Sequence, residues 1–192
     1  MTKQIVRKQL RDKRNALSQQ EQGDAELQIA LQLKALVAAN SNVAGYLAND
    51  GEVNLGAAFQ VLREQQCKVS LPILHPFRKG YLLFQHFDHN TVMTHNKFNI
   101  SEPKLSSVDA VAIATLDYIL MPLVGFDSQG NRLGMGGGFY DRTLSRLYTL
   151  EKPPVLIGIA HDCQQVESLV TEPWDIPLNA IVTPTKTLKI SV

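Results

Sequence analysis

Apolar residues recur at helical spacing near the start of the chain. Val6 and Leu10 are part of this pattern and predict a helix over residues 3–16, with cations at many of the other positions. The stretch SQQE (18–21) has the Ser-x-x-Glu spacing of a capping box and predicts that a second helix begins there. We expect that helix to end near Asn40. The chain should therefore open with a pair of helices.

Beyond this pair the pattern changes to short apolar runs that alternate with helical stretches. Strands are predicted at 42–48, 67–74, 81–87, 117–124, 155–160 and 180–183, and helices at 55–66 and 138–150. Such a pattern indicates a mostly parallel sheet covered on both faces. We expect a single three-layer α/β domain over residues 1–192, with the helix pair packed on it. Ligands in such folds bind beyond the carboxyl ends of the strands, which are followed here by the loops after Ala48, Leu74 and Val124.

Composition and charge narrow the classes of function. The 192 residues are 44% hydrophobic and 19% charged, and a net charge of +1 does not suggest nucleic-acid binding. No apolar run approaches the length of about 18 residues expected of a membrane span, and the charged N-terminus lacks the apolar core of a signal peptide. We expect a cytoplasmic protein with no membrane partner. Cys67 and Cys163 lack metal-ligand spacing and are expected to be reduced thiols.

The stretch RLGMGGGFYDR (132–142) is the least ordinary part of the chain. It follows an apolar strand and opens a predicted helix, a setting in which glycine lets the backbone approach a phosphate. Arg132 and Arg142 can add charge-assisted hydrogen bonds, and Asp141 is a carboxylate that suits Mg²⁺ beside phosphate. The spacing matches neither a P-loop nor the dinucleotide fingerprint. A strained turn that needs glycine only for positive φ is the alternative.

Other charged residues give weaker signals on their own. Lys3, Arg7 and Arg11 lie four residues apart, so one helix face carries a row of cations whose repulsion an anion would relieve. Most such rows are simply solvated faces. Glu52 lies in the loop after the first predicted strand, on the expected ligand side. Taken alone, Glu52 and Glu102 are expected to be surface acids, and the histidines do not suggest a metal site.

Taken together, these segments resemble the 5-formyltetrahydrofolate cyclo-ligase family, in order and over nearly the whole chain. The matching segments are KQIVRKQLRDKRNALS for the opening helix, YLANDGEVN for a strand and loop carrying a glutamate, ISEPK, and EPWDIPLNAIVTP near the end. The most specific match is MPLVGFDSQGNRLGMGGGFYDR, which follows the family signature P-x-x-x-F-D-x-x-G-x-R-L-G-x-G-x-G-[YF]-Y-D.

The resemblance implies a fold similar to sugar isomerases and CoA-transferases, and an enzyme that uses ATP and Mg²⁺. Members of the family convert 5-formyltetrahydrofolate to 5,10-methenyltetrahydrofolate, ADP and phosphate. The formyl oxygen attacks the γ-phosphate, and N10 of the folate then closes the ring. The implied partners are 5-formyltetrahydrofolate and ATP, and we expect a monomer, with a dimer as the alternative.

The family's site residues can be carried over to matching positions of this chain. The implied ATP contacts are Lys3, Arg7, Arg132, Leu133, Gly134, Met135, Gly136, Gly137, Gly138, Phe139 and Tyr140. The implied folate contacts are Leu47, Glu52, Met135, Gly136, Gly137, Gly138 and Phe139. The implied magnesium ligands are Asp141 and Asp175, and the implied catalytic residues are Glu52, Arg132 and Asp141. Arg7 and Arg11 offer a second register for the N-terminal pair, but the distance to RNALS favours Lys3 and Arg7.

Two positions depart from many members of the family. Gly137 stands where many carry lysine, which removes one contact to phosphate or to a folate carboxylate. Phe139 replaces a common tyrosine, so the ring is kept and the hydroxyl is lost. Two other interpretations stay open. One is a sugar-phosphate isomerase or CoA-transferase relative with no need for ATP, and the other is a folate- or nucleotide-binding protein without turnover.

Overall fold

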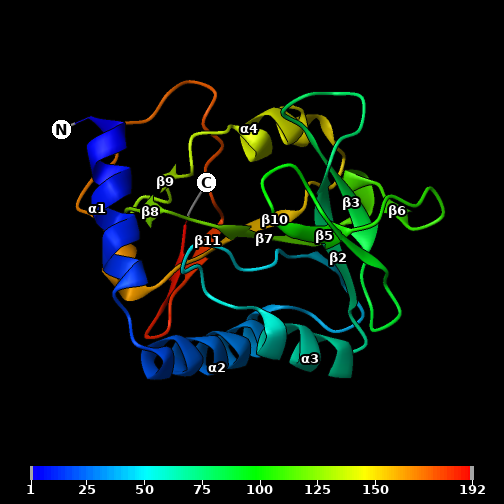
Figure 1. The fold of residues 1–192 in the computed structure, drawn as a ribbon, viewed down its shortest axis with the longest axis horizontal. Coiled ribbons are helices and arrows are strands. Elements are labelled where there is room, and N and C mark those ends of the chain that lie inside the picture. Colours follow the sequence, from blue (N-terminus) through cyan, green and yellow to red (C-terminus); the bar gives the residue numbers. More distant parts are fainter. Residues whose placement is uncertain (1, 191–192) are drawn as a thin grey trace.

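A sheet of eight strands forms the centre of the protein (Figure 1). The structure is a computed structural model that describes residues 2–190. The strands of this sheet are β1 (Asn42–Ala44), β2 (Lys68–Leu74), β3 (Leu82–His86), β6 (Ala110–Val111), β7 (Tyr118–Pro122), β10 (Val155–Ile159), β11 (Ala180–Val182) and β12 (Thr187–Lys189). Their spatial order is β12-β11-β10-β7-β1-β2-β3-β6. The pairs from β11 to β2 are parallel, whereas β12, β3 and β6 run antiparallel to their neighbours. The mostly parallel sheet predicted from the sequence is confirmed, and its edges are antiparallel.

Helices cover both faces of the sheet, as the alternating pattern predicted. They are α1 (Lys3–Asn15), α2 (Gln19–Leu36), α3 (Gly56–Glu64) and α4 (Phe139–Thr143). In Figure 1, α2 and α3 lie along one face and α4 lies on the opposite face, while α1 stands at one end of the sheet. The central strand β7 is buried on both sides. Its Leu120 packs in the core with α2 and α3, whereas Ile119 and Met121 pack in the core that contains Leu144 at the end of α4.

The two N-terminal helices form because of local signals in the sequence. The Ser18 hydroxyl accepts a hydrogen bond from the backbone N–H of Glu21 (3.2 Å), and the Glu21 carboxylate accepts one from the N–H of Ser18 (2.7 Å). This is the predicted capping box at the start of α2. The helix ends at Leu36 and not near Asn40, because Val37 turns to extended geometry and buries its side chain.

Two further predicted elements end at least four residues before their expected limits. Strand β1 ends at Ala44, four residues before the predicted limit, and the following segment leaves the sheet at Gly45, where the ring of Phe59 occupies the space of a Cβ. The helix predicted over 138–150 ends at Thr143 and is followed by a 3₁₀ turn at Leu147–Thr149. Hydroxyl groups there bond to local carbonyls, as Ser145 Oγ does to the carbonyl of Arg142 (2.9 Å), and such bonds compete with helix continuation.

Two hairpins that the sequence did not predict lie outside the main sheet. They are formed by β4 (Met93–His95) with β5 (Ser101–Pro103), and by β8 (Gly125–Phe126) with β9 (Arg132–Leu133). The first stands beyond the end of β2, and the second leads directly into the glycine-rich stretch. Neither α1–α4 nor any other described helical segment within 2–190 is long and apolar enough to cross a membrane.

Candidate functional site

A cavity of about 730 Å³ lies beyond the carboxyl ends of the parallel strands β1, β2 and β7. The loop after β1 contributes Leu47 and Glu52 to its wall, the end of β2 contributes Leu74, and the segment after β7 contributes Val124. The loops expected from the sequence to hold a ligand therefore line one cavity. Its volume is in the range that small-molecule sites occupy, roughly 300–1,000 Å³.

The segment 132–141 forms one wall of this cavity along its whole length. We call residues 134–138 the glycine loop. Gly136 and Gly138 have positive φ angles of 91° and 62°, which side chains with a Cβ rarely adopt. Turn geometry thus accounts for two of the glycines, as the alternative interpretation held, and it also brings the loop backbone to the cavity. The helix that follows has only five residues, so α4 itself offers little dipole to an anion.

Cations from α1 and β9 stand around the glycine loop. Arg7 donates from Nε to the carbonyl of Gly134 (2.8 Å), which fixes α1 against the loop. Lys3 lines the cavity one turn earlier on the same helix, and Arg132 lines it from β9. Arg11 does not line the cavity and instead pairs with Asp50 (2.6 Å). The geometry therefore favours the register of Lys3 and Arg7 over that of Arg7 and Arg11.

Arg142 lies on the far side of the glycine loop and does not line this cavity. It donates to the carbonyl of Gly80 (2.9 Å) and to the carbonyl of Gly137, so it ties the β2–β3 loop to the glycine loop. It also lines a second cavity of about 710 Å³, which shares Asp141 and Asp175 with the first. Arg142, which the sequence suggested as a second phosphate contact, thus lies outside the cavity wall that holds Arg132.

The two carboxylates expected to bind Mg²⁺ both line the main cavity, and both are engaged with cations. Asp141 accepts from Arg132, and Asp175 accepts from Lys3 (3.5 Å) and from the N–H of Glu172 (2.9 Å). Within residues 2–190, no group of three or more His, Cys, Asp or Glu side chains is arranged to hold a metal ion. Mg²⁺ commonly takes one or two carboxylates together with phosphate oxygens and water, so this pair fits a metal that arrives with a nucleotide.

Glu52 is the most perturbed acid of the cavity wall. Its side chain is 12% exposed and accepts a hydrogen bond from the N–H of Asn49 (3.1 Å). Burial raises the pKa of the Glu52 carboxyl to about 7, and the charge of Arg14, 3.9 Å away, opposes that rise. A carboxyl with a pKa near 7 can take up or release a proton at neutral pH, which is typical of functional sites.

Two tyrosines line the same cavity as Glu52. Tyr46 follows β1 and donates from its hydroxyl to the carbonyl of Val53 (3.0 Å), and Tyr140 lies in α4. Burial raises the pKa of both phenols, and the nearby Glu52 charge raises it further. Both rings therefore stay neutral at physiological pH and act as polar walls around the carboxylate.

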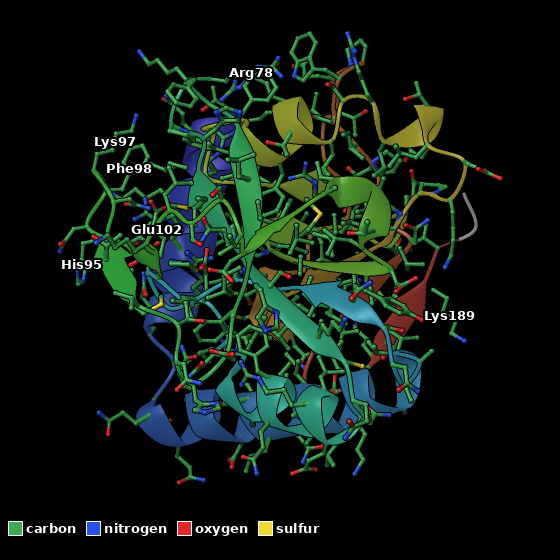
Figure 2. All side chains as sticks on the ribbon, turned by 90° about the vertical axis from the view of Figure 1, so that its right-hand side faces the viewer. Arg78, His95, Lys97, Phe98, Glu102 and Lys189 are labelled. Carbon is green, nitrogen blue, oxygen red and sulfur yellow. The ribbon has the colours of Figure 1, made fainter. Side chains whose placement is uncertain are left out.

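Glu102 is a wall residue of the cavity, which corrects its interpretation as a surface acid. It is half-buried in β5 and accepts hydrogen bonds from the N–H of Leu74 and from the Asn96 amide, both at 3.0 Å. Figure 2 shows Lys97 and Phe98 at the tip of the β4–β5 hairpin, with Glu102 nearer the sheet. The carboxylate thus anchors the hairpin over the end of β2.

Sequence reasoning missed several residues of the cavity wall, and half of them lie in or between β4 and β5, which were not predicted. The missed residues are Tyr46, Asp50, Phe98, Ile100, Glu102 and Trp174. Asp50 alone had a local signal, since NDG (49–51) is a turn sequence and Asp50 does adopt a positive φ of 52°. Phe98 and Glu102 are held by contacts between distant parts of the chain, with Phe139 and with the N–H of Leu74.

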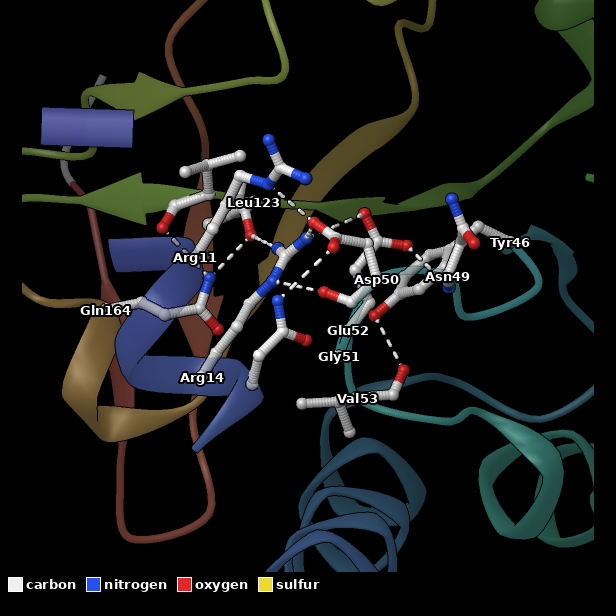
Figure 3. A network of polar contacts seen from close by, with 12 residues as sticks. Arg11, Arg14, Tyr46, Asn49, Asp50, Gly51, Glu52, Val53, Leu123 and Gln164 are labelled. Atoms are coloured by element: carbon white, nitrogen blue, oxygen red, sulfur yellow. Dashed lines mark hydrogen bonds and ion pairs between the residues drawn. The ribbon is translucent and has the colours of Figure 1, made fainter. Parts of the chain in front are cut away.

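A network of polar contacts supports the Glu52 loop from behind (Figure 3). Its centre is Arg14 in α1, whose side chain is fully buried and donates to Asp50 and to the carbonyl of Leu123. Gln164 donates to the same carbonyl (2.5 Å). The loop that carries Glu52 is therefore fixed both to α1 and to the end of β7.

Known proteins resemble this chain over nearly its full length. The model of the 5-formyltetrahydrofolate cyclo-ligase family matches residues 1–184. The 5-formyltetrahydrofolate cyclo-ligase of Haemophilus influenzae is 44% identical over 178 residues, which cover 92% of this chain and 94% of the relative. The enzyme of the same name from Escherichia coli K12 is 42% identical over 179 residues, which cover 92% and 97%.

Solved structures agree with the sequence relatives. The 5,10-methenyltetrahydrofolate synthetase of Aquifex aeolicus superposes with a TM-score of 0.81 at 28% identity, covering 99% of this chain and 93% of that one. The synthetase of Mycoplasma pneumoniae gives a TM-score of 0.76 at 27% identity, covering 96% and 99%. The match in sequence and in fold confirms the resemblance seen in the motifs: this chain belongs to the 5-formyltetrahydrofolate cyclo-ligase family of enzymes.

Proposed function

We propose that this protein converts 5-formyltetrahydrofolate to 5,10-methenyltetrahydrofolate and consumes ATP, releasing ADP and phosphate. One observation carries the proposal: a single cavity is lined by the glycine loop with Lys3, Arg7 and Arg132 and also by the buried carboxyl of Glu52. The glycine loop and its cations suit the binding of a triphosphate, and the carboxyl of Glu52 suits the removal of a proton from a folate nitrogen. The names of the relatives support the same substrate.

The nucleotide side of the cavity is assigned to the glycine loop and its cations. Backbone without side chains at Gly136 and Gly138 lets phosphate oxygens approach closely. Lys3, Arg7 and Arg132 would balance the charge of the transferring phosphoryl group, and catalysis of such transfers rests mainly on positioning and on this balance. The contacts along 132–140 proposed from the family belong to this half.

Asp141 and Asp175 would hold Mg²⁺ on the phosphate oxygens, since both line the cavity beside the glycine loop. A metal ion held there would supply neutralisation of charge on the phosphates of the nucleotide. Arg132 and Lys3, which hold these carboxylates in the structure, keep them oriented toward the same region.

The folate side is assigned to apolar wall and to Glu52. Leu47, Met135 and Phe139 are among the family's folate contacts and line the cavity together with Tyr46 and Leu71. Flat aromatic rings of a folate would bury apolar area against such walls. Glu52 lies in the same wall as Leu47, so a ring held there would have its reacting nitrogens near the carboxylate.

The proposed reaction has two steps, phosphorylation of the formyl oxygen and closure of the ring. The formyl oxygen forms a bond to the γ-phosphorus while the bond between that phosphorus and the bridging β-γ oxygen breaks, and ADP leaves. The lone pair of N10 then forms a bond to the formyl carbon, and the carbon–oxygen bond breaks as phosphate leaves with its electron pair. N10 must lose its proton in this step. Ionised Glu52 is the proposed base, and a pKa of about 7 suits that role.

The proposal is tested by following absorbance in the methenyl-folate band with purified protein, 5-formyltetrahydrofolate and Mg²⁺, with and without ATP. We expect a rise that requires ATP, is abolished by Asp141→Ala and is strongly reduced by Glu52→Gln. Matched controls are Asp24→Ala and Glu64→Gln on the exposed faces of α2 and α3, which should behave as wild type. Folate binding by calorimetry without any absorbance change would contradict turnover and favour a binding protein.

A further inference from the structure

Arg14 is a fully buried cation with no place on the cavity surface. Its Nε donates to the carbonyl of Asp50 (2.7 Å), its Nη1 to the carbonyl of Leu123 (3.0 Å), and its Nη2 to the Asp50 carboxylate (2.9 Å). Burying a guanidinium is costly unless its donors are satisfied. Here two of the three hydrogen bonds go to Asp50 in the Glu52 loop, and the third goes to Leu123 at the end of β7. The sequence offers no local reason for this placement.

The loop that Arg14 holds is one that needs support. Asp50 and Gly51 are consecutive residues with positive φ, 52° and 75°, and Glu52 follows directly. A non-glycine residue in this region is strained, and such strain persists only where the surroundings fix it. Arg11 and Asn15 donate further hydrogen bonds to the Asp50 carboxylate (2.6 and 3.2 Å), so α1 holds the loop through three side chains (Figure 3).

Arg14 also lies closest to Glu52 among the cations of residues 2–190, with Nη2 3.9 Å from Oε1. The other charged or titratable groups that face Glu52 are Asp50 in its own loop, Tyr46 after β1 and Tyr140 in α4. None of these three carries positive charge, so Arg14 provides the cation that favours ionised Glu52. His161 lies near Gly51 and Arg14, and its Nε2 has no partner within 2–190. Burial lowers the pKa of the His161 ring, so the neutral ring adds no second cation.

We propose that Arg14 is a positioning residue for the cyclisation, acting through the Glu52 loop. It fixes Glu52 on the cavity wall through Asp50 and Leu123, and its charge favours the ionised form of the carboxylate that accepts the N10 proton. The inference rests on the proposed function, because it assigns Glu52 the role of base. A merely structural role for Arg14 would lower the amount of folded protein equally at every pH.

The test compares Arg14→Met with Arg11→Met over pH 5.5–9. Met keeps an unbranched apolar stem and removes the guanidinium charge, and Arg11 binds the same Asp50 carboxylate without an ion pair to Glu52. With Arg14→Met we expect the acid limb of kcat/KM to move about one unit toward higher pH, since a close opposite charge has an effect of that size. With Arg11→Met the limb should stay where it is in the wild type. An acid limb of Arg14→Met that coincides with the wild type would overturn the proposal.

A readout without turnover separates this inference from the proposed function. Titration of ¹³C-labelled glutamate carboxyls by NMR, with Glu52 assigned by Glu52→Gln, should show its midpoint rising in Arg14→Met. If the wild type fails to cyclise the folate while this midpoint still rises, the proposed function fails and the control of Glu52 by Arg14 stands. If the wild type turns over and the midpoint does not move, the inference fails alone.

Arg14→Lys is the variant to test if Arg14→Met does not fold. Lysine keeps the charge but cannot reach Asp50 and Leu123 at once with a planar fork. We expect an unmoved acid limb and a kcat at least about 10-fold lower, because the base is no longer fixed at the reacting nitrogen. A wild-type kcat in this variant would overturn the positioning role.

Discussion

Phe98 at the tip of the β4–β5 hairpin meets Phe139, the first residue of α4, edge to face, with ring centroids 6.0 Å apart and planes at 88°. Phe98 is otherwise 53% exposed, and both rings line the main cavity. The contact joins a surface hairpin to the end of the glycine loop. It places two aromatic rings on the wall of the cavity in which the folate is proposed to bind.

Replacing Phe98 with Ala should weaken folate binding more than it slows the chemistry. An aromatic pair of this geometry is worth about 0.5–1.5 kcal/mol beyond its buried area, so we expect KM for 5-formyltetrahydrofolate to rise about 3- to 10-fold. KM for ATP and kcat should change less. Steady-state kinetics would check this, with Phe77→Ala as control because Phe77 is 91% exposed and lines neither cavity. Equal effects of the two variants would contradict the assignment of the hairpin tip.

Ionisation of the buried Glu52 carboxyl should lower the stability of the folded protein. The pKa of this carboxyl is about 7 in the folded protein against an ordinary value of 4.5, so the folded state holds a proton between these pH values that the unfolded state has lost. The free energy of unfolding should therefore fall as pH rises from 4.5 to 7 and stay lower above. Glu52→Gln removes the cost of burying the charge. We expect the free energy of unfolding of this variant at pH 8 to exceed that of the wild type by about 1–3 kcal/mol.

Urea unfolding of both proteins at pH 8 and at pH 4.5 measures that difference. Near pH 4.5 the two should be almost equal, because Glu52 is then protonated in the folded state. A Gln variant that is less stable than wild type at pH 8 would mean that the ion pair with Arg14 outweighs the cost of burial.

Local patterns predicted the parts of the fold that depend on neighbouring residues. Ser18 and Glu21 are three apart, and their capping box is present as expected. The apolar run of β7 predicted a strand buried on both faces, because in a parallel sheet covered by helices both sides need apolar residues. Family motifs then located the glycine loop and Glu52 on the wall of one cavity.

Contacts between distant residues account for what the sequence did not predict. Glu102 is fixed by the N–H of Leu74, 28 positions earlier, and Arg14 by the carbonyl of Leu123, 109 positions later. No periodicity over a short window carries such information. The β4–β5 hairpin was missed for a related reason, because its strands have three residues each and lack a run of apolar alternation.

Gly138 should not tolerate a side chain. Its φ of 62° is unfavourable for other residues, and a Cβ would lie 2.8 Å from Nη1 of Arg142. We expect Gly138→Ala to lose about 1–3 kcal/mol of stability and most of its activity, since Arg142 would release the β2–β3 loop. Gly23→Ala is the matched control: nothing lies within 4 Å of its Cβ position in α2, and helix propensity predicts a gain of about 0.5–1 kcal/mol. Thermal unfolding and the absorbance assay would compare the two, and equal activity of both variants would contradict the role of the glycine loop.

Asp141 and Asp175 should differ from other surface acids in how their loss changes the need for Mg²⁺. Replacing either with Asn keeps its size and removes the charge that would bind the metal, so the Mg²⁺ concentration for half-maximal rate should rise at least about 10-fold. Asp141→Asn also removes the ion pair of Arg132, and Asp175→Asn removes one of the two acidic partners of Lys3, the other being Glu172, so both cations should draw nucleotide phosphate more strongly. A lower KM for ATP at low Mg²⁺ would distinguish loss of a ligand from general damage to the site. Asp24→Asn on α2 serves as control, and an unchanged Mg²⁺ requirement in Asp175→Asn would remove Asp175 from the proposed metal site while leaving Asp141 in it.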